Sequence, residues 1–109
     1  MKKTKFKSVF DNGKYFYSRY LIAYALKSEK DINNDVGIIV SKKIGNSVVR
    51  HKFTRRIREV CRLNINNYLT GYSLILIAKK SILNADYNEL NEDFLKMIKY
   101  IRKNEEDTN

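Results

Sequence analysis

A cluster of basic side chains is the feature of this sequence best suited to chemistry. Lys and Arg crowd residues 41–62, SKKIGNSVVRHKFTRRIREVCR. The whole chain has 22 basic and 12 acidic residues, which gives a formal net charge of +10. Because guanidinium and ammonium groups bind phosphate, this surface is expected to meet a polyanion. Nucleic acid and an anionic membrane are the two candidates.

A helix beginning near Ser47 would divide this segment into two faces, since side chains three and four residues apart share a face. The apolar stripe consists of Val49, Phe53, Ile57 and Val60, and the opposite face consists of His51, Arg55, Arg58 and Arg62. We expect the stripe to dock on the fold and the basic face to point outward. Charge alone leaves a merely solvated basic face as the alternative.

The start of this helix is suited to binding a phosphate. Gly45 permits an unusual turn, and Asn46 or Ser47 can cap the first unpaired amides. Free N–H groups, the helix dipole and the ammonium groups of Lys42 and Lys43 would together attract an anion.

The sequence offers little for RNA cleavage by this chain alone. It has one histidine, so a pair of imidazoles acting as acid and base is excluded. On a straight helix His51 and Cys61 would lie about 15 Å apart, too far for a dyad. Carboxylates on the last predicted helix, namely Asp86, Glu89, Glu92 and Asp93, are expected to cap and solubilise it rather than to hold metals. We predict no catalytic residue and no metal site.

Cysteine content and hydropathy indicate the compartment. Cys61 is the only cysteine, which excludes an internal disulfide and a cysteine-rich zinc site. The N-terminus lacks the apolar core of a secretory signal, and no apolar run reaches the roughly eighteen residues of a membrane span. We expect a cytoplasmic protein, with membrane binding a minor option and Cys61 a partly buried structural residue.

Hydrophobic periodicity predicts the elements that position the basic helix. Residues 6–12 favour a short helix that ends at Asn12, with Gly13 left-handed beyond it. Residues 20–26 alternate as a strand with both faces covered, and Tyr20, Ile22, Tyr24 and Leu26 share one side. The polar residues 28–35 are interpreted as a hairpin loop into a buried strand at 36–40.

After the basic helix, residues 64–71 form a polar exit and residues 72–78 a buried strand. The last helix is capped by Asp86 with Glu89, and residues 104–109 are expected to fray. Its core positions are Tyr87, Leu90, Phe94, Met97, Ile98 and Ile101. The order is α-β-β-α-β-α, an α+β fold in one domain over residues 1–109, with the basic helix as crossover.

The order and spacing of the basic segment resemble a known signature. The matching residues are Lys42, Lys43, Gly45, Asn46, Val49, Arg50, Arg55 and Arg58. They follow the pattern KK-x-G-N-A-V-x-R-N-x-x-K-R-x-x-R of the bacterial ribonuclease P protein subunit. The likeness extends from F-x-x-V-F-x-x-G at residues 6–13 through the later strand and helix. His51 stands where the family usually has Asn, and Thr54 where it usually has a basic residue.

The resemblance implies a fold and a function. The fold is a sandwich like the second domain of ribosomal protein S5, with a left-handed β-α-β crossover where most proteins have a right-handed one. The function is that of a subunit of an endoribonuclease holoenzyme, one protein to each catalytic RNA. In that holoenzyme the RNA, with Mg²⁺, removes the 5′ leader from precursor tRNA, and the protein binds RNA and leader.

The resemblance also assigns residues to roles. Lys42, Lys43, Gly45, Asn46, Arg50, Arg55 and Arg58 would contact the catalytic RNA, and His51 and Arg62 complete the predicted RNA-binding set. Phe6, Phe10 and Tyr24 would form the cleft for the single-stranded leader, although sequence alone favours a core role for these rings.

Two other functions are compatible with a basic α+β domain. A ribosomal-type protein that only stabilises folded RNA would show the same charge and a similar fold, and it remains the alternative. A helix-turn-helix DNA binder is disfavoured because a strand, not a helix, leads directly into Gly45.

Overall fold

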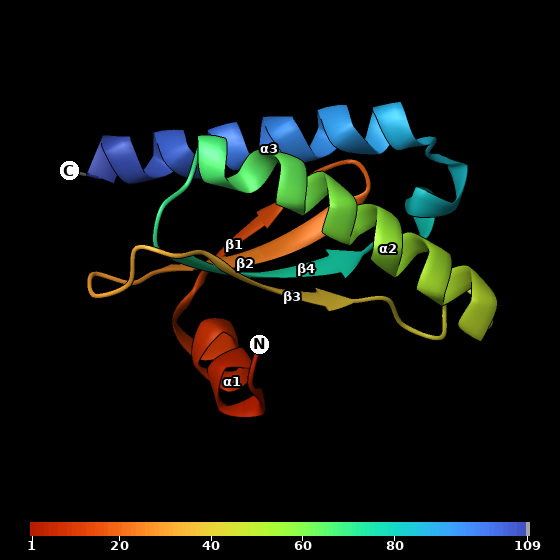
Figure 1. Cartoon of the computed structure of the whole chain (residues 1–109), viewed down its shortest axis with the longest axis horizontal. Coiled ribbons are helices and arrows are strands. Elements are labelled where there is room, and N and C mark those ends of the chain that lie inside the picture. Colours follow the sequence, from red (N-terminus) through yellow and green to blue (C-terminus); the bar gives the residue numbers. More distant parts are fainter. Residues whose placement is uncertain (109) are drawn as a thin grey trace.

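One four-stranded sheet, in the order β1-β2-β4-β3, organises the molecule. The computed structural model describes the backbone of residues 1–108 and the side chains of residues 1–105. The strands are β1 (Lys14–Tyr17), β2 (Leu21–Lys27), β3 (Asp35–Ile39) and β4 (Tyr72–Ala78), and the α-helices are α1 (Lys3–Asn12), α2 (Ser47–Asn64) and α3 (Tyr87–Thr108). Helices α2 and α3 cover one face of the sheet, and α1 lies alone under the other (Figure 1). The predicted α+β class is confirmed.

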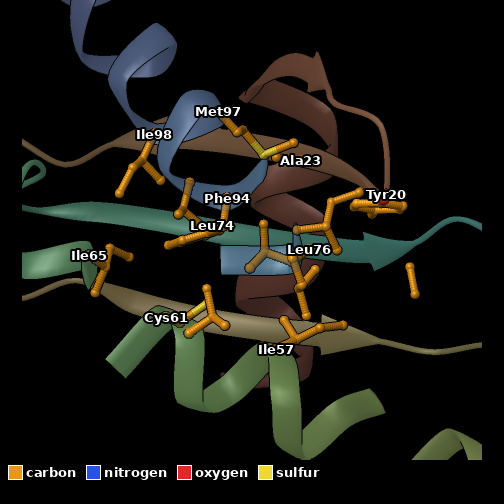
Figure 2. Close-up of a cluster of buried hydrophobic side chains, with 14 of the residues drawn as sticks. Tyr20, Ala23, Ile57, Cys61, Ile65, Leu74, Leu76, Phe94, Met97 and Ile98 are labelled. Atoms are coloured by element: carbon orange, nitrogen blue, oxygen red, sulfur yellow. The ribbon is translucent and has the colours of Figure 1, made fainter. Parts of the chain in front are cut away.

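Strand β4 is central because its sequence, YSLILIA, is apolar on both faces. It runs antiparallel to β2 and parallel to β3. Leu74 and Leu76 point toward the helices, where Ile57 of α2 and Phe94 of α3 meet them (Figure 2). On the opposite face Ile75 is fully buried, as is Val9 of α1. The sheet therefore has a main core under α2 and α3 and a smaller one under α1.

Strand β1 was not predicted. Its four residues, KYFY, bury only Phe16, so the apolar alternation is too short to stand out between Gly13 and Ser18. It pairs antiparallel with β2 at the edge of the sheet. The element order is therefore α-β-β-β-α-β-α, with one more strand than expected.

The predicted hairpin at residues 28–35 is wrong, because β4 lies between β2 and β3. The loop instead crosses the beginning of β4. The Ser28 N–H donates to the carbonyl of Gly71 at 2.8 Å. The Asn34 side chain donates to the Leu69 carbonyl at 2.8 Å and accepts from the Tyr72 N–H at 2.9 Å. Because β3 and β4 are parallel neighbours, α2 is the crossover between them. The left hand of that crossover stays a prediction of the resemblance.

Gly13 ends α1 as expected, but it is not left-handed, since its φ is −76°. Glycine is required there because two backbone carbonyl groups lie close to its Cα. An added Cβ would lie 2.5 Å from the Val9 carbonyl oxygen and 3.1 Å from that of Ala25. The chain can therefore turn from α1 straight into β1 only with glycine at this position.

Helix α3 begins with the predicted capping box. The Asp86 carboxylate accepts from the Glu89 N–H at 2.8 Å, and the Glu89 carboxylate accepts from the Asp86 N–H at 3.1 Å. The predicted core positions Leu90, Phe94, Met97, Ile98 and Ile101 are buried. Tyr87 is not a core residue, because the first turn leaves it 36% exposed. The helix continues through Thr108, beyond the point where fraying was expected, and Asn109 lies outside the described residues.

Asp93 has a different role from the one expected for a solubilising carboxylate. It is 9% exposed and accepts hydrogen bonds from the turn between β1 and β2. The donors are the Ser18 hydroxyl at 2.6 Å, the Arg19 N–H at 3.1 Å and the Tyr20 N–H at 3.0 Å. Tyr20 precedes β2 and is buried. Asp93 thus ties the third helix to the edge of the sheet.

The two faces of β2 differ, so the prediction that both are covered is wrong. Leu21, Ala23 and Ala25 are buried under the helices, whereas Ile22, Tyr24 and Leu26 are only half-buried on the side of α1. Helix α1 has ten residues and leaves part of this sheet face open.

Candidate nucleic-acid interface

The start of α2 is fixed by Asn46, whose side-chain oxygen accepts from the Val49 N–H at 3.0 Å. Just before it, buried Ile44 anchors the turn that presents Lys42 and Lys43 to solvent. Gly45 does not adopt the unusual backbone conformation that was expected, because Gly71 is the one glycine with positive φ among the described residues. An added Cβ at Gly45 would instead lie 2.9 Å from the Val49 side chain.

The predicted division of α2 into two faces is confirmed. Phe53, Ile57 and Val60 are buried together with Cys61, and Val49 is half-buried. We call six exposed residues of α2 and of the turn before it the basic face, namely Lys42, Lys43, His51, Arg55, Arg58 and Arg62. A shallow groove of about 480 Å³ on this face is lined by Ser47, Val48, His51, Lys52 and Arg55. Arg58 and Arg62 line a second groove, of about 420 Å³, beside β3.

Three positions of α2 depart from a freely exposed basic side chain. Arg50 is half-buried, and its Nε is buried without a hydrogen-bond partner among the described residues. Arg62 donates from Nε and Nη2 to the Glu59 carboxylate at 3.2 and 2.7 Å, and this bonding lowers the pKa of Glu59. The Thr54 hydroxyl donates to the Arg50 carbonyl at 2.8 Å. Arg55 and Arg58 are exposed and take part in none of these interactions.

Cys61 is structural, as predicted. Burial raises the pKa of its thiol to about 12, so the thiol stays neutral at physiological pH and is a poor nucleophile. Within the part of the chain that the structure describes, no group of three His, Cys, Asp or Glu side chains is placed to hold a metal ion. No helix in that part is both long and apolar enough to cross a membrane.

On the opposite side of the sheet the structure brings together the three rings that were predicted to line a cleft. Phe6 and Phe10 of α1 have ring centroids 6.5 Å apart, and Phe10 lies edge-on to Tyr24 of β2 at 4.9 Å. Phe6 sits over Gly37 of β3, where an added Cβ would come within 2.5 Å of the ring. Phe6 and Tyr24 are half-buried, and Phe10 is 38% exposed. We call Phe6, Phe10 and Tyr24 the aromatic face.

Two further rings adjoin the aromatic face. Tyr15 of β1 lies opposite Tyr24 in the sheet, with ring centroids 5.4 Å apart, and Tyr17 follows at 6.2 Å from Tyr15. Sequence reasoning missed both, because it assigned no strand to residues 14–17. The aromatic pair flanking Phe16 was the signal that could have found them, since tyrosines two residues apart in a strand share a face.

A comparison with protein families matches residues 1–102 to the family described as Ribonuclease P. The ribonuclease P protein component of Lachnoclostridium phytofermentans is 40% identical over 108 residues, covering 96% of this chain and 92% of that protein. That of Natranaerobius thermophilus is 38% identical over 98 residues, covering 90% of this chain and 84% of that protein.

Solved structures agree on the fold. The ribonuclease P protein from Thermotoga maritima, in complex with 1-(4-fluorophenyl)-2-thiourea, matches with a TM-score of 0.80 at 25% identity, covering 91% of this chain and 97% of that one. The Staphylococcus aureus ribonuclease P protein matches with a TM-score of 0.83 at 24% identity, covering 93% of this chain and 92% of that one. The latter likeness concerns the fold alone.

Proposed function

Because this chain belongs to the ribonuclease P protein family, we propose that it holds a catalytic RNA with the basic face and the 5′ leader of precursor tRNA with the aromatic face. The chain is thus the protein component of a ribonucleoprotein enzyme, and the RNA carries the chemistry. The outcome of the reaction is endonucleolytic removal of the leader to give the mature 5′ end of tRNA.

One observation carries this proposal, namely that two surfaces of different chemistry lie on opposite sides of one sheet. The basic face belongs mainly to α2, which covers one side of the sheet, whereas α1 lies on the other side (Figure 1). The aromatic face is formed by the rings of α1 and the Tyr24 ring of β2. Cations bind phosphates of any RNA, whereas exposed rings stack on unpaired bases. A protein built this way can bind a folded RNA and a single strand at the same time.

Binding of the leader gives the protein a role in choosing substrates. A precursor tRNA carries the leader and mature tRNA does not, so contacts with the aromatic face favour the substrate over the product. Stacking depends little on base identity, which suits leaders of many sequences. We assign Mg²⁺ to the RNA and one protein to each RNA, as the family resemblance implies.

Replacing Arg55 and Arg58 together by Ala should weaken binding to the catalytic RNA and flatten its salt dependence. Both side chains are exposed on α2. Each lost phosphate contact should change the slope of log K against log salt by about 0.7 to 0.9. Filter binding or fluorescence titration at several salt concentrations would measure the slope.

The matched control is Lys96→Ala with Lys103→Ala on α3, which removes the same charge from exposed positions. We expect it to change the slope less than the α2 variant. Equal slopes for the two variants would mean that only net charge matters and that α2 makes no specific RNA contact.

A further inference from the structure

A groove along the outer edge of β1 has no role in the function proposed above. Its volume is about 590 Å³, and it is lined by Lys14, Tyr15, Phe16, Tyr17, Tyr100 and Asn104. Sites for small ligands have volumes of roughly 300 to 1,000 Å³, so one or two nucleotides fit this space. Strand β1 ends the sheet, and its outer side pairs with no other strand in the described part of the chain.

A continuous series of rings leads from the aromatic face into this groove. The centroid distances are 4.9 Å from Phe10 to Tyr24, 5.4 Å from Tyr24 to Tyr15 and 6.2 Å from Tyr15 to Tyr17. Tyr24 is half-buried, but the rings on either side of it are exposed, with exposed fractions of 38% at Phe10, 54% at Tyr15 and 73% at Tyr17. Such exposure leaves ring surface free for a ligand, whereas a core role would bury it.

The charges around the groove suit an anion. The Lys79 ammonium lies 5.9 Å from the centre of the Tyr17 ring and donates to the Ser18 carbonyl at 2.9 Å, which holds it beside the ring. Lys14 donates to the Asn104 side chain at 3.0 Å within the groove. No carboxylate is among the lining residues. A cation held beside an exposed ring offers one partner for a phosphate and another for a base.

We infer that this groove receives further nucleotides of the 5′ leader, beyond those that stack on the aromatic face. The inference rests on the proposed function, because it extends the path of the same strand. Tyr17 is the stacking platform and Lys79 the phosphate partner. A peptide that added a strand to β1 would gain few backbone hydrogen bonds from four residues, so RNA is the better occupant.

The test uses the reconstituted holoenzyme and precursor tRNAs whose leaders are lengthened one nucleotide at a time. Wild type, Tyr17→Ala, Tyr17→Phe and Tyr17→Leu are compared by equilibrium binding. With short leaders all four should bind alike. Once the leader reaches the groove, Tyr17→Ala should bind about fivefold more weakly, the low end of the loss for one stacked base. Tyr17→Phe should bind like wild type, whereas Tyr17→Leu, which keeps apolar bulk but has no ring, should not. Lys79→Gln should also bind precursor tRNAs with long leaders more weakly than wild type does.

Three outcomes would overturn the inference. One is that Tyr17→Ala and Lys79→Gln match wild type at every leader length while Phe10→Ala still weakens precursor binding, in which case the proposed function stands without the groove. The second is equal weakening for mature tRNA, which would place Tyr17 outside the leader path. The third is full rescue by Tyr17→Leu, which would show that apolar bulk at this position supports binding and that no base stacks on the ring. If Phe10→Ala also has no effect at any leader length, the proposed leader site fails too.

Discussion

Replacing Asp93 by Ala should lower the free energy of unfolding by about 3 kcal/mol, since the change leaves one buried and two partly buried donors without their charged acceptor. Those donors are the Ser18 hydroxyl and the N–H groups of Arg19 and Tyr20, at 2.6 to 3.1 Å from the carboxylate. The loss would loosen the turn between β1 and β2 and its attachment to α3. Urea unfolding followed by circular dichroism would measure it.

Glu92 provides a matched control, because it is the neighbouring acidic residue on α3 and is exposed. Glu92→Ala should change the free energy of unfolding by less than about 0.5 kcal/mol. If Asp93→Ala and Glu92→Ala unfold at the same urea concentration, Asp93 does not support the turn.

The double replacement of Phe10 and Tyr24 by Leu should weaken binding of precursor tRNA in the holoenzyme by about 2 kcal/mol or more, on a scale of 1 to 3 kcal/mol for each stacked base. Leu retains apolar bulk at both positions and removes the rings. Mature tRNA has no leader, so its binding should stay nearly unchanged. Equilibrium binding of both RNAs to wild type and variant would measure the difference.

Thermal melting of the free proteins is the control for this variant. Truncating a fully buried Phe to Ala costs about 3 to 5 kcal/mol of stability, but Phe10 is 38% exposed and Tyr24 half-buried, so the loss should be much smaller. Equal weakening of precursor and mature tRNA, or a large drop in melting temperature, would mean that the rings serve the core.

Local sequence signals predicted α2 and α3 well because each signal acts within one element. The cap at Asn46, the stripe from Phe53 to Val60 and the capping box of Asp86 with Glu89 all appear as expected. Apolar residues on both sides of β4 predicted its burial, and the central position of β4 in the sheet follows from that burial.

Features set by distant contacts were not predicted from periodicity. Strand β1 exists because it pairs with β2. The loop before β3 is held at the start of β4 by hydrogen bonds from the Tyr72 N–H to the Asn34 side chain and from the Ser28 N–H to the Gly71 carbonyl. Asp93 looks like any exposed helix carboxylate in the sequence, but the turn between β1 and β2 folds onto it.

The candidate site also contains some residues that local spacing predicted and others that only contacts between elements could position. The spacing of His51, Arg55 and Arg58 on one helix was enough to place them on one exposed face. The meeting of Phe10 with Tyr24 was anticipated only through the family resemblance, since no local rule relates a ring on α1 to a ring on β2. Tyr15 and Tyr17 were missed because their neighbours are known only once β1 is paired. Packing and pairing between elements therefore decide which rings lie next to one another on the surface.

The central claim is that this protein enables a catalytic RNA to process precursor tRNA. The most direct measurement adds the purified protein to a catalytic RNA of the ribonuclease P class at low Mg²⁺ and follows release of the 5′ leader. We predict that cleavage at the mature 5′ end becomes much faster with protein than with RNA alone, and that the variant lacking Arg55 and Arg58 needs a higher protein concentration for the same rate. A protein that binds the RNA tightly but leaves the cleavage rate unchanged would contradict this claim and identify a structural RNA-binding protein instead.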